Sequence, residues 1–212
     1  MTVSVEITIE PQELDAAMER LKDVPYAFQR AVYPAVAEVM QEVRNHLAEY
    51  ISSDVPLPPK AALKAIRLYA PRMQGDGVVG EVVVQSRMFP LIDYDVQPKE
   101  ITARKGLHPR QWPDFTFSLR RGDLRAGRSR VQGVSLPFIA RMPAGHLGVY
   151  YRTGRKTKKG NVQIKESYGP TVQYHVATPE VEGAISEQAH SNFPAILARY
   201  VDQALANHGG GE

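Results

Sequence analysis

The chain has 212 residues, of which 43% are hydrophobic and 23% charged, with a net charge of +3 at pH 7 and no cysteine. This composition is typical of a globular protein, and the length is sufficient for a single domain with a buried core. The absence of cysteine excludes disulfides and thiolate chemistry and suits assembly in a reducing cytoplasm. No apolar run approaches the roughly 20 residues that span a bilayer, and no signal peptide is expected.

The N-terminal part predicts a strand followed by two helices. Apolar residues alternate with polar ones from Val3 to Ile9, and this period of two indicates a strand. Pro11 begins a short helix. After Pro25, apolar residues recur every three or four positions and predict an amphipathic helix to about Ser52, in which Pro34 should cause a kink or split off the first turn.

The next segment predicts short elements around turns. Residues 54–59 form a proline-rich connector, residues 61–67 one or two helical turns, and residues 66–70 a strand. The sequence Gly75-Asp76-Gly77-Val78-Val79-Gly80 matches the glycine pattern of dinucleotide-binding proteins. That pattern requires a helix after it, whereas a strongly β-forming run follows here, so we interpret it as a turn leading into a strand at 78–85. Residues 88–96 are expected to be extended.

A basic segment without clear periodicity follows, at about residues 99–134. We predict a long loop or extended arm, with one strand at 115–119. Its cations include Arg120, Arg121, Arg125, Arg128 and Arg130. Trp112 and Phe115 are candidates either for stacking on nucleic-acid bases or for anchoring a protein interface, and the second interpretation is favoured.

The residues from Phe138 to Pro170 predict two strands joined by a basic turn and ended by Tyr168-Gly169-Pro170. The turn, residues 152–160, places five cations at one point: Arg152, Arg155, Lys156, Lys158 and Lys159. Residues 99–165 hold 16 Lys and Arg against 3 Asp and Glu, a net charge of +13, and the rest of the chain carries −10. Such segregation favours contact with an acidic protein surface or with nucleic acid, although the cations can also serve solubility alone.

The C-terminal part predicts a helix that begins at Thr178-Pro179-Glu180 and runs to about Asn207, interrupted at Pro194. Residues 207–212 are expected to form a flexible tail. The order of elements predicts a single α+β domain, with a mostly antiparallel sheet between a long N-terminal and a C-terminal helix.

Catalytic and metal-binding patterns do not emerge from the sequence. The six histidines include no pair at helical metal-ligand spacing, and no serine lies in a nucleophile elbow. Asp93 and Asp95 share a face of an expected extended segment, but a third acidic ligand is missing nearby. We therefore expect no enzyme activity, no cofactor and no metal.

The motif within residues 138–170 resembles the minor tail protein Z family of tailed bacteriophages and prophages. The matching residues are Phe138-Ile139-Ala140, Met142-Pro143, Gly145-His146, Gly148-Val149-Tyr150, Arg152, Gly154, Ile164-Lys165-Glu166 and Tyr168-Gly169-Pro170. The order of elements from about residue 31 to residue 205 also fits. The family usually has proline immediately before Ile-Lys-Glu, where this chain has Gln163.

The resemblance implies a structural virion protein that completes the tail at its head-proximal end and takes part in head–tail joining. It also implies assembly in the host cytoplasm, a location in the virion tail or neck, and a homo-oligomeric ring, for which we expect a hexamer. The expected partners are neighbouring tail and head–tail connector proteins, with non-specific contact to DNA in the lumen and no membrane. The alternative is a basic accessory protein that binds nucleic acid.

Overall fold

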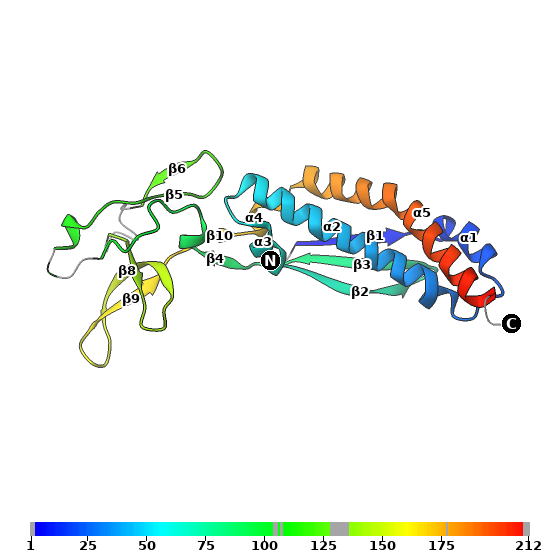
Figure 1. Ribbon diagram of the computed structural model, residues 1–212, viewed down its shortest axis with the longest axis horizontal. Coiled ribbons are helices and arrows are strands. Elements are labelled where there is room, and N and C mark those ends of the chain that lie inside the picture. The colour runs from blue at the N-terminus through cyan, green and yellow to red at the C-terminus, as the bar shows by residue number, and fades with distance from the viewer. Residues whose placement is uncertain (1–2, 104–105, 107, 128–135, 177, 210–212) are drawn as a thin grey trace. The chain divides into compact units, whose positions relative to one another are not determined.

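The structure is a computed structural model that describes residues 3–103, 106, 108–127, 136–176 and 178–209. The chain divides into two compact units, whereas the sequence predicts a single domain. Unit 1 consists of residues 1–50, 59–86 and 172–212, and unit 2 of residues 51–58 and 87–171. Helices and antiparallel sheets are both present (Figure 1), which confirms the α+β class.

The sheet of unit 1 has three antiparallel strands in the order β1–β3–β2, at Val3–Ile9, Gly77–Val84 and Ile66–Gln74. β2 and β3 form a hairpin in which Gln74 pairs with Gly77. Gly75 occupies the turn with a φ of 62°, a conformation that glycine adopts without steric cost. The interpretation of the glycine-rich sequence as a turn is therefore confirmed.

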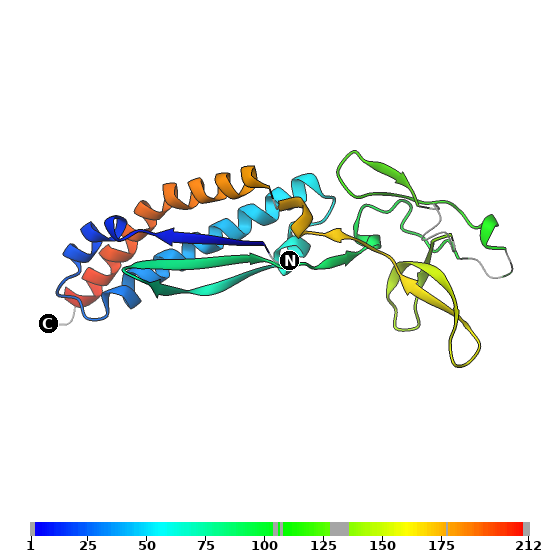
Figure 2. The ribbon, with the colours of Figure 1, turned by 180° about the vertical axis from the view of Figure 1, so that it is seen from behind.

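The two long helices, α2 at Tyr33–Asp54 and α5 at Pro179–Gly209, run along this sheet (Figures 1 and 2). The shorter helical segments are α1 at Pro11–Arg20, a π-helical turn at Phe28–Val32, α3 at Pro59–Ala62 and α4 at Gln173–Val176. A short 3-10 turn, Leu63–Ala65, joins α3 to β2. α2 packs closely on β3, because a Cβ placed on Gly80 would come within 2.5 Å of the Met40 sulfur.

The two predicted proline effects have different outcomes. Pro34 follows the π-helical turn at the start of α2, so the predicted separation of the first turn is confirmed. Pro194 lies inside α5 without ending it, so the predicted interruption is wrong. Pro194 is exposed, where water can hydrate the carbonyl that loses its partner, and the buried side chains of Phe193 and Leu197 hold the helix on the core on either side of it.

Unit 2 is built from short strands. β4 (Met88–Pro90) pairs with β10 (Tyr168–Thr171), β5 (Thr116–Ser118) pairs with β6 (Leu124–Ala126), and β7 (Phe138–Arg141), β8 (Leu147–Lys156) and β9 (Val162–Glu166) form a three-stranded sheet. The stretch predicted as two strands thus contains four. Tyr168-Gly169-Pro170 is not a stop but part of β10, where Tyr168 pairs with Pro90.

The described part of the predicted basic arm is folded into unit 2. The amide of Thr102 donates to the carbonyl of Ile139 at 3.0 Å, and the amide of Ile139 donates to the buried Thr102 hydroxyl at 2.8 Å. A 3-10 turn at Pro109–Gln111 and the β5–β6 hairpin follow. The described residues of the predicted loop or arm are thus mostly irregular, one of the two predicted alternatives, and they are hydrogen-bonded within unit 2. Arg128 and Arg130 lie outside the described residues, as do residues 210–212 of the predicted tail.

Candidate interaction surfaces

The β8–β9 hairpin presents its cations at an exposed tip. β8 continues to Lys156, so the connecting loop is residues 157–161 and is shorter than the predicted 152–160. Inside it the amide of Gly160 donates to the carbonyl of Thr157 at 2.9 Å. Every residue from 154 to 162 is exposed. Within the described chain, the four cations of the tip have no ion-pair partner: Arg155, Lys156, Lys158 and Lys159.

The fifth predicted cation, Arg152, has a different environment. Its side chain is half-buried, and its guanidinium carbon lies 5.1 Å from the centroid of the Trp112 ring and 5.0 Å from that of Phe138. Cations at such positions over aromatic rings are attracted by the ring quadrupole. Arg152 therefore fixes the base of the hairpin on unit 2 and does not belong to the exposed tip.

Trp112 and Phe115 are core residues, which makes their predicted role as exposed anchors or stacking platforms wrong. Trp112 is 9% exposed and packs with Phe138 and Tyr150. Phe115 is 2% exposed and lies against Gly127, where an added Cβ would come within 2.2 Å of the phenyl ring. The sequence does not reveal this burial, because the packing partners of Trp112 are distant in the chain.

The described arginines of the former arm bind groups of their own unit. The Arg121 side chain donates to the carbonyl of Ser52 at 2.9 Å. Arg120 lies 3.6 Å from a carboxylate oxygen of Asp54, and Arg125 lies 2.6 Å from Asp123. The bond with Asp123 also raises the pKa of Arg125. These contacts hold the β5–β6 hairpin within unit 2 and engage its arginines. The β8–β9 tip is therefore the stronger candidate for a basic interaction surface.

A polar cluster joins the turn before β8 to the end of β9. His146 Nε2 lies 2.6 Å from Glu166 Oε1, and the hydroxyl of Tyr168 donates to Glu166 Oε2 at 3.1 Å. Gly148 lies beneath this cluster, since a Cβ there would meet Glu166 Oε1 at 2.6 Å. These contacts give His146, in the turn before β8, a structural role.

Apolar side chains accompany the charges on β9. Val162 is 49% and Ile164 39% exposed, so the apolar side chains of this strand are not covered by the described part of the chain. β9 lies at an edge of its sheet and pairs only with β8 in the described part of unit 2. An exposed edge with apolar side chains is a common place for protein contacts, and Lys165 on the same strand limits unspecific pairing.

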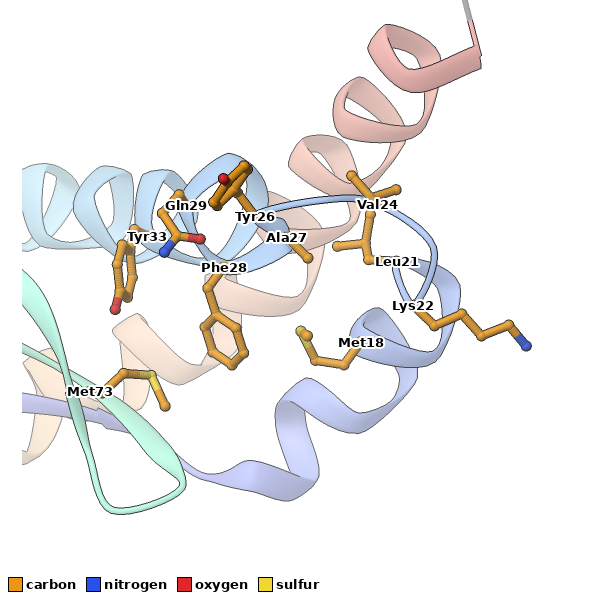
Figure 3. Close-up of a pocket in the computed structure, with 10 residues that line it drawn as sticks. All are labelled: Met18, Leu21, Lys22, Val24, Tyr26, Ala27, Phe28, Gln29, Tyr33 and Met73. Carbon is orange, nitrogen blue, oxygen red and sulfur yellow. The ribbon is translucent and has the colours of Figure 1, made fainter.

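Several grooves with apolar lining are open on the described surface. One, of about 1100 Å³, lies in unit 2 and includes Met88, Phe117, Leu119 and Tyr168. A second, about 390 Å³, lies in unit 1 between α1, the π-helical turn and the β2–β3 hairpin, where Met18, Phe28 and Met73 point toward one another (Figure 3). A third, about 320 Å³, lies between α2 and α5. The sequence patterns give no signal for any of them.

The predicted pair of aspartates is not on an extended strand. Asp93 ends a 3-10 turn, Leu91–Asp93, and Asp95 has a φ of 44°, so the segment after β4 turns sharply. Asp95 accepts a hydrogen bond from the Gln97 side chain at 3.0 Å. Among the residues that the structure describes, His, Asp and Glu side chains do not gather in groups of three that could hold a metal ion.

The described helices include none that is both long and apolar enough to cross a membrane. The chain was also compared with protein-family models, with curated proteins and with solved structures, and none of these comparisons finds a match.

Proposed function

We propose that the chain is a structural protein of a bacteriophage particle, a minor tail or tail-completion protein that acts at the head-proximal end of the tail. The observation that carries this proposal is the ordered set of residues between Phe138 and Pro170, through which the chain resembles the minor tail protein Z family. Its role would be in tail assembly and in joining the tail to the DNA-filled head.

The contacts among these residues explain why they depend on one another in the folded chain. A Cβ on Gly148 would collide with Glu166, and one on Gly169 would come within 2.3 Å of the Tyr94 ring. His146 and Glu166 are in direct contact, and Phe138 lies in the core. The motif therefore specifies how β7 to β10 fold, and it supports a scaffold role for unit 2 and not a reaction centre.

The charge distribution supports assembly with other proteins. Unit 1 holds 9 Lys and Arg against 16 Asp and Glu, a net charge of −7, while unit 2 holds 17 against 7, a net charge of +10. Opposite charges on two units of one chain favour ordered contacts, either between copies or with neighbouring tail and connector proteins. We propose a homo-oligomeric ring, with six copies as the expected number.

Removal of the gene from the phage or prophage that encodes it tests this function. We expect DNA-filled heads and unattached tails in electron micrographs of the resulting particles, with joining restored when the protein is supplied from a plasmid. Joined particles at the normal yield without the protein would contradict the proposal.

A second candidate is a nucleic-acid-binding accessory protein, favoured by the four exposed cations of the β8–β9 tip, which form no ion pair with any described residue. Affinity for any DNA duplex should then fall steeply with salt, because each neutralised phosphate releases a counterion. The matched test is Lys158→Ala/Lys159→Ala, which should reduce the salt slope by about 2 if both lysines contact phosphates. Absence of duplex binding at low salt excludes this candidate.

A further inference from the structure

The groove between α2 and α5 in unit 1 has an apolar floor. α5 contributes Val181 and Ile185, which are each 6% exposed, together with the exposed Ala184. α2 contributes His46 and Tyr50, and the His46 Nε2 atom lies 3.3 Å from Gln188 Nε2 across the groove. Its volume of about 320 Å³ is at the small end of ligand pockets, which suits one or two anchoring side chains better than a large ligand.

Carboxylates surround this floor. Glu180 lines the groove, and its own backbone amide together with the Thr178 hydroxyl lowers its pKa, so it is ionised at neutral pH. Glu187 follows Ala184 by three residues on α5, and Glu49 follows His46 by three residues on α2, so helical spacing places both exposed acids beside the groove. Lysine and arginine are absent from its described lining. The rim is therefore acidic.

The β8–β9 tip has the complementary properties. It carries Arg155, Lys156, Lys158 and Lys159, and the half-exposed apolar side chain of Val162 follows. Lys156 lies four residues beyond Arg152, the last residue packed on the aromatic cluster, so the hairpin extends about 13 Å further at the rise of a β-strand. A narrow, basic, protruding hairpin fits a small acidic groove better than a flat surface does.

We propose that the β8–β9 tip of one copy binds the α2–α5 groove of a second copy, with lysine and arginine side chains against Glu180, Glu187 and Glu49. The contact joins two different surfaces, so each copy offers one of each and the copies associate head to tail. Rings or open chains result from such contacts, depending on the rotation between neighbours. The inference specifies the contact inside the homo-oligomer of the proposed function, but it can be tested on the purified chain alone.

The test uses two variants of the full chain that each remove one side of the contact. Lys158→Ala/Lys159→Ala weakens the tip, and Glu180→Gln/Glu187→Gln weakens the groove. Sedimentation velocity should show an oligomer for the unmodified protein, dissociating as salt is raised, and a monomer for each variant alone. An equimolar mixture should give dimers that do not grow, because one unmodified tip meets one unmodified groove. A misfolded variant could not produce this rescue.

Control variants remove the same number of positive or negative charges at other positions of the chain. Lys60→Ala/Lys99→Ala and Asp15→Asn/Asp76→Asn alter exposed residues outside both surfaces and should leave the oligomer unchanged. Ala184→Trp fills the groove without a change of charge and should also give a monomer. A monomeric unmodified protein at low salt, or an oligomer that all the variants retain, overturns the inference. The particle phenotype of the gene deletion is a separate readout, so the proposed function can stand or fail independently.

Discussion

The guanidinium carbon of Arg152 lies 5.1 Å from the centroid of the Trp112 ring and joins the basic hairpin to the aromatic cluster of unit 2. Trp112 meets Phe138 edge to face, with 5.2 Å between the ring centroids, and Phe138 is 6.3 Å from Tyr150. The cation thus lies over two members of a buried cluster. Its position explains how a hairpin with an exposed, charged tip is held at its base.

Replacement of Arg152 by alanine should destabilise unit 2 by about 1–2 kcal/mol, because a partly desolvated cation–π contact and the packing of the side-chain stem are both lost. Trp112 is the single tryptophan of the chain, so its fluorescence during urea unfolding reports on this unit. Arg155→Ala, at the exposed tip, is the matched control and should change the midpoint very little. Equal effects of the two substitutions would contradict the role assigned to Arg152.

The sequence predicts the elements whose signals are local. The 3.6-residue period of α2 and α5, the alternation in β1 and the glycine turn at Gly75 depend only on neighbouring residues, and all four appear in the structure. The start of α5 is also local, since the Thr178 hydroxyl lies 3.4 Å from the amide of Val181.

Unit 2 could not be predicted in the same way, because its signals are not local. Its strands β4, β5, β6 and β10 have only three or four residues each, too few for a period to emerge. Phe115 is buried by Gly127 and Trp112 by Phe138, so burial depends on pairings that form only in the folded chain. For the same reason the arginines near residue 120 look free in the sequence, although Arg121 binds the carbonyl of Ser52.

Gly169 should tolerate no side chain. A Cβ at this position would lie 2.3 Å from the Tyr94 ring, which is fully buried, so Gly169→Ala forces the ring or β10 to move. We expect a loss of about 1–3 kcal/mol, typical of overpacking, with an earlier urea midpoint in Trp112 fluorescence. Gly183→Ala in α5 is the matched control. It meets nothing within 4 Å and should be neutral or stabilise by up to about 1 kcal/mol, measured by circular dichroism. A stable Gly169→Ala protein would contradict the close packing.

The stability of unit 2 should fall at alkaline pH because of Tyr94. Burial raises the pKa of this phenol from 10.0 to about 12, with a smaller effect of the Asp93 charge. The folded state therefore favours the protonated form. This stabilisation is complete below pH 10 and is lost as the pH rises toward 12, since the unfolded chain releases the proton first.

Tyr94→Phe isolates this effect. The variant loses the hydrogen bond from the hydroxyl to the Pro170 carbonyl, 2.8 Å long, and should be less stable at pH 8 by about 1 kcal/mol. Urea midpoints measured from pH 8 to 11.5 should then converge for the two proteins, because only the unmodified chain has a phenol at residue 94 that loses its proton on unfolding. Parallel curves over this range would show that Tyr94 does not titrate as proposed.

The Glu166 carboxylate should control the ionisation of Tyr168. The hydroxyl of Tyr168 donates to Glu166 Oε2 at 3.1 Å, and this hydrogen bond, together with the negative charge of Glu166, raises the pKa of the phenol. Glu166→Gln removes the charge that opposes the phenolate, so the pKa of Tyr168 should fall toward its ordinary value. NMR titration of the chain with 13C-labelled tyrosine measures this, with the resonance assigned by its loss in Tyr168→Phe. Glu6→Gln removes an exposed carboxylate from unit 1 and should leave this resonance unaffected. An unchanged Tyr168 titration in Glu166→Gln would mean that the polar cluster at the end of β9 does not hold in solution, and the motif residues His146 and Glu166 would then need another explanation.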